Sequence, residues 1–529
     1  MRAPCDEMVI RSQGADAPCM ASARPWILVA TILGSSMAFI DATVVNVAIP
    51  TLQTAFHATV VDAQGVVESY GLFLSSLILT GGALGDLFGR RRVFLIGVGV
   101  FAAASAACGL APNILMLIFA RCVQGIGAAL LVPGSLAIIG ASFDEESRGK
   151  AIGTWSGFTA ITTALGPVIG GWLIEHGSWR WAFFLNLPLA VAVVMISLWH
   201  VPESRGSKTE HVDWWGALTA TLGLGGLVTG LLESAKLGWG NPVVFGSLAE
   251  GSTCLVIFMV IEARASTPMV PLELFNSRSF LGANVVTLFL YAAIGVFFFL
   301  FPMNLIRVQG YSTTAAGAAA LPMILLMFLL SRWSGGLVNR YGRKTPLIVG
   351  SLIIASGFTL FAVIPGGSSY WKTYFPAFLV LGIGMAVTVA PLTTVVMSSV
   401  DREHVGAASG INNAVARVAG VLAIAVFGIV MVKAFGARLE QNLARLSFAA
   451  DIVQEIRSKE IDLAGLEPPL GLDANAVAAI RRTISDAFLA GFRLVLLACA
   501  GLSVASALVA WRLIGASTDR RAGRVASTV

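Results

Sequence analysis

Apolar runs long enough to cross a lipid bilayer recur along almost the whole chain, and this recurrence limits the fold more than any other feature. A transmembrane helix needs about 20 apolar residues, whereas a membrane barrel needs shorter segments with alternating apolar and polar residues. The runs are too long for barrel strands and do not alternate, so the sequence predicts an all-α polytopic membrane protein with about fourteen spans. The runs lie near residues 26–50, 67–84, 93–110, 113–139, 151–174, 181–200, 214–235, 242–262, 280–302, 313–333, 346–364, 373–397, 407–435 and 488–513.

The composition agrees with a membrane protein. Hydrophobic residues make up 56% of the 529 residues, and the charged share of 12% is about half that of a soluble domain. The net charge of +6 comes from basic residues in short loops between the runs, so nucleic-acid binding is not predicted. The cysteines form no C-x-x-C pair and no cluster with histidine, so neither a disulfide framework nor a metal site is predicted. They are Cys5, Cys19, Cys108, Cys122, Cys254 and Cys499.

A short charged segment occurs twice between apolar runs. The first copy, Gly82–Arg92, reads GALGDLFGRRR, and the second, Gly335–Lys344, reads GGLVNRYGRK. Aligning Gly89 with Gly342 matches the pattern G-x-L-x-[DN]-x-x-G-R-[RK] at an offset of 253 residues. Such a repeat indicates two related halves of a membrane protein. At about 30 residues for each span and its loop, the offset equals about eight spans, which predicts six-helix halves separated by an inserted helix pair.

This plan divides the chain into an amino-terminal tail (1–25), a six-helix half (26–200), an inserted pair with its linkers (201–265), a second six-helix half (266–515) and a tail (516–529). Within the second half, residues 436–487 carry mixed charge and are broken at Pro468-Pro469. Asp473 is placed to cap a helix through Ala476–Ile484. We expect an extracytoplasmic helical hairpin there.

The distribution of basic residues predicts the orientation. Short loops that carry an excess of lysine and arginine stay in the cytosol. This rule predicts that both termini are cytosolic and that the protein lies in the inner membrane of the cell. The predicted inner loops hold Arg90, Arg91, Arg92, Arg148, Lys150, Arg205, Lys208, Arg264, Arg278, Arg332, Arg340, Arg343, Lys344 and Arg402. The predicted short outer loops hold only Arg180, Lys236, Arg307 and Lys372.

Three of the charged residues inside predicted spans, Asp41, Arg121 and Glu68, are candidates for proton coupling. Asp41 follows Trp26 by 15 residues, or about 22 Å along a helix. An acid at that depth is expensive, so it either faces a cavity and takes part in proton movement or is held by local hydrogen bonds. Arg121 cannot lose its charge and needs an acid, carbonyl groups or water; it serves either proton coupling or helix linkage. Glu68, in the second span, is either a second protonatable site or an interfacial acid exposed to water.

Several longer motifs resemble one transporter family. They are Ile40–Pro50 (IDATVVNVAIP), Ala120–Gly127 (ARCVQGIG), Gly153–Gly157 (GTWSG) with Gly166–Gly171 (GPVIGG), and Trp179–Pro188 (WRWAFFLNLP). With the repeated loop, the chain resembles the major facilitator superfamily, and specifically its fourteen-span drug:proton antiporter branch (the EmrB/QacA type). The resemblance covers almost everything from Trp26 to Trp511.

The resemblance implies roles for the motif residues. Asp41, Arg121 and Glu68 would couple protons to transport. The repeated loop would brace the inner face closed, through Gly82, Asp86, Gly89, Arg90, Arg91, Gly342 and Arg343. The antiporter motif of exporters would include Gly157, Gly166, Pro167, Gly170 and Gly171, although glycines at this spacing also serve ordinary helix packing. Candidate cavity residues, for which helix–helix hydrogen bonding is the alternative, are Asn46, Gln124, Asn412, Asn413 and Arg417.

We therefore expect a proton-coupled exporter of small amphiphilic compounds or drugs that works by alternating access as a monomer. A dedicated exporter of one metabolite, peptide, siderophore or antibiotic is the alternative, and a membrane receptor or scaffold is a third class. The chain contains no Walker A sequence and no H-E-x-x-H motif, so an ATP-driven pump or a metalloenzyme is not predicted. The proton gradient would be the energy source, and no cofactor or metal is expected.

Overall fold

The structure is a computed structural model that describes residues 23–143, 145–205, 213–265, 268, 270–364, 369–400, 405–446, 448, 450–469 and 472–515. Most of the predicted amino-terminal tail and the whole predicted carboxy-terminal tail lie outside these residues. The predicted tail cysteines Cys5 and Cys19 and the predicted inner-loop residues Lys208 and Arg402 lie outside them as well.

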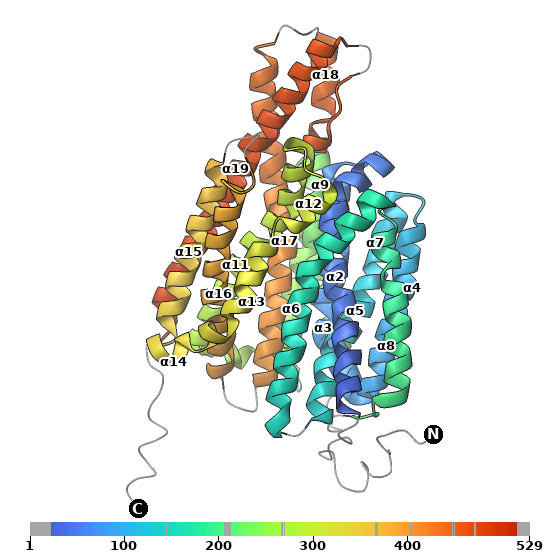
Figure 1. Ribbon diagram of the computed structural model, residues 1–529, viewed down its shortest axis with the longest axis vertical. Helices are drawn as coiled ribbons and strands as arrows, with labels where there is room; N and C mark the ends of the chain where they lie inside the picture. Colours follow the sequence, from blue (N-terminus) through green and yellow to red (C-terminus); the bar gives the residue numbers. More distant parts are fainter. Residues whose placement is uncertain are drawn as a thin grey trace, which may run out of the picture. The chain divides into compact units, whose positions relative to one another are not determined.

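The described ranges contain helices and no β-strand, as the apolar runs predict (Figure 1). Thirteen helical segments in this part of the chain are long and apolar enough to cross a membrane. The remaining predicted span, 151–174, lies inside a single helix of 32 residues, Glu145–His176. The all-α polytopic prediction is therefore confirmed. Contacts divide the chain into two compact units, described one at a time below; the predicted six-plus-two-plus-six division stays a prediction.

Unit 1 comprises residues 1–269, 298–318 and 424–491. Its complete helices are α2 (Arg24–Phe56), α3 (Val60–Phe88), α4 (Arg90–Leu110), α5 (Ile114–Ser142), α6 (Glu145–His176), α7 (Trp181–Phe184), α8 (Asn186–His200), α9 (Trp214–Leu237), α10 (Pro242–Arg264), η2 (Asn304–Val308), α12 (Thr313–Ala318), α18 (Ala450–Ser458) and η4 (Glu460–Gly465). Unit 1 also contains the end of α11 (Arg278–Met303) and parts of α17 (Val405–Leu443) and α19 (Ala474–Leu513).

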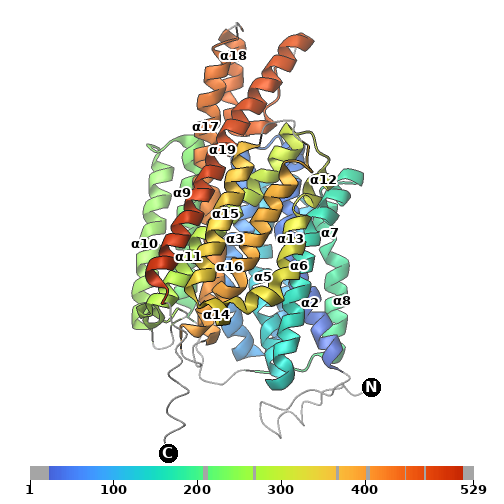
Figure 2. The same ribbon diagram turned by 60° about the vertical axis from the view of Figure 1, so that its left-hand side comes forward.

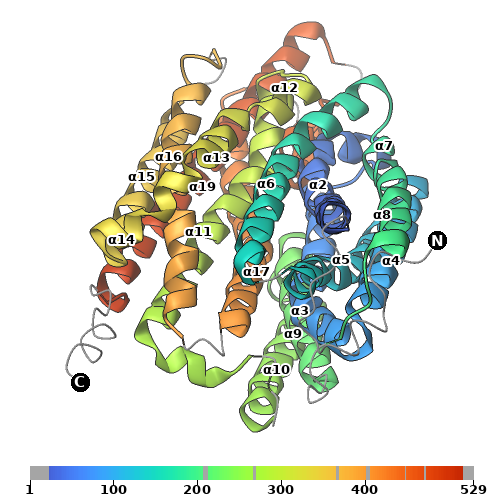
Figure 3. The ribbon, with the colours of Figure 1, turned by 60° about the horizontal axis from the view of Figure 1, so that its bottom comes forward.

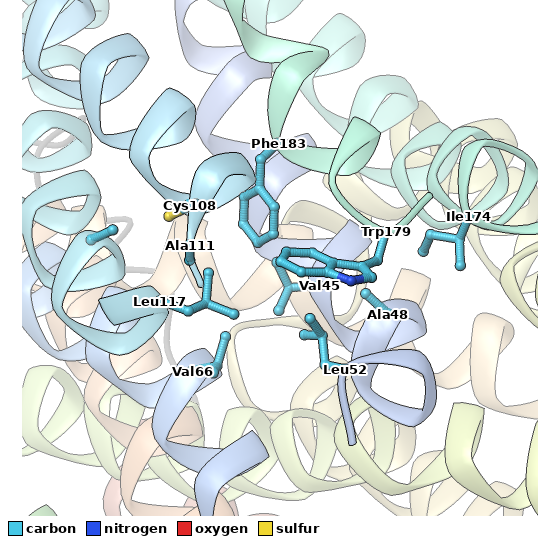
Figure 4. Packing of buried hydrophobic residues seen from close by; sticks show 11 residues of the cluster. Val45, Ala48, Leu52, Val66, Cys108, Ala111, Leu117, Ile174, Trp179 and Phe183 are labelled. Carbon is cyan, nitrogen blue, oxygen red and sulfur yellow. The ribbon is translucent and has the colours of Figure 1, made fainter. Parts of the chain in front are cut away.

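One apolar cluster of unit 1 lies beside Asp41 and Arg121, two of the charged residues that the sequence singles out. It brings together side chains from α2, α3, α4, α5, α6 and α7 (Figure 4). Val45 follows Asp41 by one helical turn, and Ala120 directly precedes Arg121. The cluster therefore excludes water from one side of these two charges. Its buried members are Val45, Ala48, Leu52, Val66, Cys108, Ala111, Leu117, Ala120, Ile174, Trp179 and Phe183.

The helices α9 and α10, which the sequence predicts to be an inserted pair, lie side by side (Figure 3). Gly226 and Gly251 meet at the contact, where a Cβ on Gly226 would lie 2.8 Å from the Gly251 Cα. Asp213 caps α9 by accepting a hydrogen bond from the Gly216 backbone, and Asn241 caps α10. Close packing through glycine is the usual solution for helices in lipid, where apolar burial gives no driving force.

Unit 2 comprises residues 270–297, 319–423 and 492–529. Its core contains ring contacts among Phe297 of α11, Phe358 and Phe361 of α15, and Phe378 of α16. A hydroxyl pair, Ser351 and Ser506, links α15 to α19 at 3.1 Å. The elements of this unit are η1 (Leu272–Asn276), α11 (Arg278–Met303), α13 (Leu321–Gly335), α14 (Leu337–Tyr341), α15 (Lys344–Val363), α16 (Tyr374–Ser398), the first part of α17 (Val405–Leu443) and the later part of α19 (Ala474–Leu513).

The segment 436–487, called the hairpin below, is helical as predicted and belongs to unit 1 (Figures 1 and 2). Asp473 caps α19 by accepting a 2.6 Å hydrogen bond from the Ala476 backbone, which confirms the predicted cap. The helices extend beyond the predicted spans 407–435 and 488–513, because α17 continues to Leu443 and α19 begins at Ala474. Each of these helices therefore runs without a break from a predicted span into the hairpin.

The turn η4 packs on α2, α3 and η2. Its Leu463 is fully buried and has φ 51°, a backbone conformation that is costly for a residue with a branched side chain. Only two non-glycine residues in the described ranges have positive φ, and the other, His57, ends α2 as an ordinary left-handed cap. The hairpin is thus anchored to the body of unit 1 by burial of Leu463.

Candidate functional site

Asp41 and Arg121, which the sequence singles out separately, are in contact inside unit 1. Arg121 of α5 donates from Nη1 to Asp41 Oδ2 of α2, and both side chains are buried, with exposed fractions of 0% and 1%. Gln124 lies one turn after Arg121, accepts from its Nη1 at 2.7 Å and donates from Nε2 to Asp41 Oδ1 at 2.8 Å. The predicted cavity residue Gln124 is therefore a bridge within the ion pair.

Two further residues complete this network and were not singled out from the sequence. Asn186, at the start of α8, donates from Nδ2 to Asp41 Oδ1 at 3.2 Å and to Ser105 Oγ at 3.0 Å. Ser105 of α4 also accepts a 2.7 Å hydrogen bond from Gln124 Nε2. Four helices thus meet at one buried carboxylate. Asn186 is part of the WRWAFFLNLP motif. A polar residue within an apolar helix was the feature of the sequence that could have indicated a buried hydrogen-bonding role for it.

The remaining contacts of Arg121 tie it to α3. Its Nε donates to the Val66 carbonyl at 3.1 Å, and its guanidinium lies 4.2 Å from the centre of the Tyr70 ring. Tyr70 in turn donates from its hydroxyl to the Ala38 carbonyl of α2 at 3.0 Å. Cation–π contact and carbonyl acceptance both stabilise a cation that cannot lose its proton.

The Asp41 carboxylate is surrounded by donors from two other helices. It accepts hydrogen bonds from Arg121 and Gln124 of α5 and from Asn186 of α8. A buried ion pair is tolerated only when further hydrogen bonds satisfy its remaining polar atoms. The contacts of Asp41 and Arg121 therefore link α2 to α3, α5 and α8 through one buried pair of charges.

Glu68 has the opposite environment. Its side chain is 1% exposed, and neither carboxyl oxygen has a hydrogen-bond partner among the described residues. One turn earlier on α3, Gln64 donates to the Ile424 carbonyl of α17 at 3.4 Å, and one turn later Leu72 faces Gly225 of α9. Glu68 is therefore buried in the protein, which excludes the reading as a water-exposed interfacial acid. It is not part of the Asp41 network.

The antiporter motif on α6 forms the closest helix contacts of the site. Gly166 packs on Ile40 and Thr43 of α2. A Cβ on Gly171 would lie 2.5 Å from the Thr313 carbonyl oxygen, and Gly317 of α12 meets the Pro167 carbonyl just as closely. Glu175, near the end of α6, accepts a 3.0 Å hydrogen bond from the Thr314 backbone at the start of α12. Here small residues allow backbone contact between α6 and α12.

Substituting Gly171 by alanine is expected to lower transport and stability, because the added methyl would force α6 and α12 apart at a strain of about 1–3 kcal/mol. The matched control is Gly99→Ala in α4, where a Cβ would have nothing within 4 Å. That change is expected to leave dye efflux unchanged. Thermal unfolding and efflux of both purified variants measure the difference. Equal behaviour of the two variants would show that the α6–α12 contact tolerates the extra atom.

A second connection joins η2 to α2. Arg307 donates from Nη2 to the Pro50 carbonyl at 2.6 Å and to Thr54 Oγ1. Pro50 lies inside α2, and its own carbonyl is the acceptor. Arg307 entered the sequence analysis only as an outer-loop charge, and the structure gives it a specific acceptor on α2.

The first copy of the repeated loop is held within unit 1. Asp86 pairs with Arg90 at 2.7 Å, and Gly82 packs on Pro133 of α5. Glu203 accepts from the backbone of Arg91 at 3.0 Å, which places an anion at the amino terminus of α4. Glu203 was not singled out from the sequence, since it lies more than a hundred residues from the loop it caps.

The repeated glycines have a common structural reason. Gly89 has φ 111° and directly precedes α4, which begins at Arg90. Gly342 has φ 79° and lies two residues before α15, which begins at Lys344. Glycine adopts such angles without steric cost, so both copies of the motif require it. A Cβ on Gly89 would also collide with the Glu203 carboxylate. In the second copy, Arg343 is the residue before α15 and is half-buried.

The remaining predicted cavity residues do not join the Asp41 network. Asn412 donates to Asn284 Oδ1 at 3.1 Å and to Thr287 Oγ1 at 2.7 Å, which links α17 to α11 within unit 2. Asn413 is exposed and donates to the Ser409 carbonyl of its own helix. Arg417 of α17 and Asn46 of α2 are half-buried. Asn412 therefore acts in helix–helix hydrogen bonding, the alternative considered for it.

No group of three or more histidine, cysteine, aspartate or glutamate side chains suited to a metal ion occurs in the described part of the chain. The four described cysteines, Cys108, Cys122, Cys254 and Cys499, are free.

Several known proteins with similar sequences are named as drug-resistance or multidrug transport proteins. The chain is 32% identical over 493 residues to the multidrug resistance protein Stp of Mycobacterium tuberculosis, covering 92% of this chain and 91% of that protein. It is 31% identical over 505 residues to the tetracenomycin C resistance and export protein of Streptomyces glaucescens, covering 94% and 93%. The multidrug transporter protein MdtP of Bacillus subtilis is 28% identical over 420 residues, covering 78% and 76%.

Solved transporters share the fold. A bacterial homologue of the human lysosomal transporter Spinster, in an inward-facing and unoccupied conformation, superposes with a TM-score of 0.64 at 18% identity, covering 94% of this chain and 99% of that chain. A D-xylose–proton symporter superposes with a TM-score of 0.58 at 15% identity, covering 93% and 98%. The sequence profile of the Major Facilitator Superfamily matches residues 31–424. The chain therefore belongs to the Major Facilitator Superfamily of membrane transporters, with relatives among the drug-resistance exporters.

Proposed function

We propose that the protein is a proton-coupled antiporter that exports small amphiphilic compounds or drugs by alternating access. The names of the relatives support drug-like substrates. The observation that carries the coupling is the contrast between two buried acids on neighbouring helices. Asp41 accepts three hydrogen bonds, one of them from its ion-pair partner Arg121, whereas Glu68 has no partner among the described residues.

In this proposal Glu68 holds a proton in the conformation described. An ionised carboxylate that is buried without a donor costs several kcal/mol, so the neutral acid is favoured. Asp41 is the second proton carrier. Its protonation would free Arg121 from α2, and Arg121 contacts α3 through Val66 and Tyr70. Binding of a proton would thereby change the packing of the helices that carry both acids.

The driving force is the proton gradient. Moving one elementary charge through a membrane potential of 100 mV supplies about 2.3 kcal/mol, and a pH difference adds to it. The resemblance of Gly166–Gly171 to the antiporter motif of exporters supports export, and in this motif Pro167 and Gly171 pack directly on the backbone of α12. The expected topology has both termini in the cytosol of an inner membrane, and the expected organisation is two six-helix halves with the inserted pair α9–α10.

The direct test uses everted membrane vesicles that carry the protein and ethidium as a fluorescent substrate. Imposing an acidic interior is expected to drive ethidium into the lumen, together with a measurable loss of interior protons. Vesicles that contain the protein but move neither ethidium nor protons, for this and a panel of other amphiphiles, would contradict the antiporter proposal and favour a receptor or scaffold. Export of one compound only would favour the dedicated exporter, a role consistent with the tetracenomycin relative.

Substituting Asp86 by alanine is expected to slow efflux while leaving substrate affinity largely intact. Asp86 lies at the end of α3, away from the Asp41 network along the helix, and it orders the loop by pairing with Arg90. Losing this pair would disturb the loop between α3 and α4 without touching the buried network. Efflux rates as a function of ethidium concentration separate turnover from affinity. A large loss of affinity with normal turnover would contradict the assignment.

A further inference from the structure

The pocket at the foot of the hairpin lies at the level where a membrane span ends. It has a volume of about 570 Å³ and is bounded by the last turn of α9, by α17 and by the α18–η4 region, all within unit 1. Ser234, on its edge, belongs to the final turn of α9, a helix of 24 residues. A helix of that length just crosses the hydrocarbon core, so the pocket opens at the membrane–water interface. This placement does not depend on which side of the membrane the hairpin occupies.

The wall that α17 gives to the pocket carries apolar side chains on both sides of Lys433. Ile429 and Val432 precede it and Leu439 follows it, and Val432 and Leu439 are buried. A ligand that fills this pocket therefore needs an apolar part. Its polar part would face the charged side chains that line the same pocket.

The charged side chains are of both signs. Arg457 of α18 pairs with Glu440 of α17, so these two charges neutralise each other. Lys433 and Glu460 remain, and neither forms an ion pair within the described part of the chain. The pocket thus offers one cation and one anion that are available to a ligand.

Lys433 and Glu460 are close along α17. Gly436 follows Lys433 by three residues, an axial rise of about 4.5 Å. A Cβ on Gly436 would lie 2.6 Å from Glu460 Oε2, so the carboxylate rests against the bare backbone of α17 at that level. The Glu460 carboxylate therefore lies about one helical turn along α17 from the backbone of Lys433, whose flexible side chain lines the same pocket. A compact zwitterion whose charges are separated by a two-carbon link matches this spacing.

We propose that this pocket binds the headgroup of an aminophospholipid, with the phosphate at Lys433, the primary ammonium at Glu460 and an acyl chain along the apolar wall. A primary ammonium donates charge-assisted hydrogen bonds to a carboxylate, which a quaternary choline cannot do. A glycerol headgroup has the phosphate but no cation for Glu460. The bilayer is the source of the ligand, because the pocket opens at the interface.

The test uses the full-length protein in bilayer nanodiscs with equal amounts of phosphatidylethanolamine, phosphatidylcholine and phosphatidylglycerol, followed by native mass spectrometry of retained lipid. The wild type is expected to retain phosphatidylethanolamine over phosphatidylcholine by about tenfold, the size of one hydrogen bond to a charged group. Glu460→Gln is expected to abolish this preference and to keep phosphatidylglycerol binding. Lys433→Gln is expected to weaken retention of all three lipids.

The matched control is Lys459→Gln, since Lys459 is an exposed lysine of the same hairpin that pairs with Glu455 and does not line the pocket. It is expected to bind lipid as the wild type does. Unaltered preference in Glu460→Gln, unaltered retention in Lys433→Gln, or absence of retained lipid in the wild type would each overturn the proposal. Soluble phosphoethanolamine, added to lipid-free protein, is expected to bind far more weakly than the lipid; equal binding would show that the apolar wall has no part.

The pH dependence gives a further check. Burial raises the pKa of Glu460, the neighbouring Glu440 raises it further, and Arg457 lowers it. Only the ionised carboxylate pairs with an ammonium, so the preference for phosphatidylethanolamine is present at neutral pH. It is lost as the pH falls through the raised pKa, at a higher pH than an ordinary glutamate would require. A preference that persists unchanged at acidic pH, below the range of ordinary glutamates, would exclude Glu460 as the ammonium site.

Discussion

Substituting Asp41 by asparagine is expected to abolish proton-driven efflux and to destabilise the protein. The variant cannot release or take up a proton at this position. It also leaves Arg121, which is fully buried, without its anion. Removing one partner of a buried ion pair typically destabilises a protein by about 3–5 kcal/mol. Ethidium accumulation in everted vesicles is expected to fall by more than tenfold, or about 1.4 kcal/mol of barrier, and the midpoint of thermal unfolding is expected to fall with it.

A double variant separates the two effects. Asp41→Asn with Arg121→Gln removes both charges. No unpaired buried cation remains, so the thermal stability of the protein is expected to recover in part. Proton-driven accumulation is expected to remain lost, because the protonatable group is still missing. Restored coupling in the double variant would mean that Asp41 only neutralises Arg121, and Asp41 would then leave the proton mechanism. Undiminished coupling in the single variant would lead to the same conclusion.

Substituting Glu68 by glutamine is expected to stop proton coupling without destabilising the protein. Glutamine has nearly the shape of a protonated glutamate, and the carboxyl group makes no hydrogen bond that the change would break in the described structure. The variant therefore resembles one permanently protonated state. Proton-driven ethidium accumulation is expected to fall by more than tenfold, or about 1.4 kcal/mol of barrier. Exchange of ethidium across the membrane without a proton gradient is expected to continue.

The matched control is Glu233→Gln, which neutralises a half-buried acid in the neighbouring helix α9. That variant is expected to accumulate ethidium as the wild type does. If Glu68→Gln keeps full proton-driven accumulation, Glu68 carries no transported proton. If it unfolds at a clearly lower temperature, the carboxyl group has a structural partner and the reading as an isolated protonated acid fails.

The two variants are expected to fail in different ways, which makes their comparison informative. Asp41 is held by three side chains from two helices, α5 and α8, so its loss is expected to disturb stability and coupling together. Glu68 has no described partner, so its loss changes charge alone. The difference cannot be read from the sequence, in which both are single acids inside apolar runs.

Local features of the chain were predictable because they depend on near neighbours. The length of the apolar runs predicts the helices, and the Asp473 cap depends only on the residues that follow it. The glycines of the repeated loop agree with a local need for positive φ at Gly89 and Gly342. The family follows from motifs of the same local kind, and the sequence profile covers residues 31–424.

Two helices, α17 and α19, extend beyond the spans predicted from hydropathy. The charged residues after Phe435 and before Phe488 end the apolar pattern, so the predicted spans end there. The backbone of α17 and α19 nevertheless continues into the hairpin, since polar residues are good helix formers once the helix leaves the membrane. Hydropathy therefore locates the membrane boundary, while helix ends depend on capping and packing.

By itself, the sequence determined an all-helical membrane transporter of the major facilitator type, and it singled out Asp41, Arg121 and Glu68 among the charged residues inside the spans. Only the tertiary structure decided which of these acids is paired. Asn186 contacts Asp41 across 145 residues, and Glu203 caps a helix that begins more than a hundred residues earlier. Such contacts depend on how helices pack, and the free energy of a buried charge depends on every group around it. Periodicity along one chain contains no information about that surrounding shell.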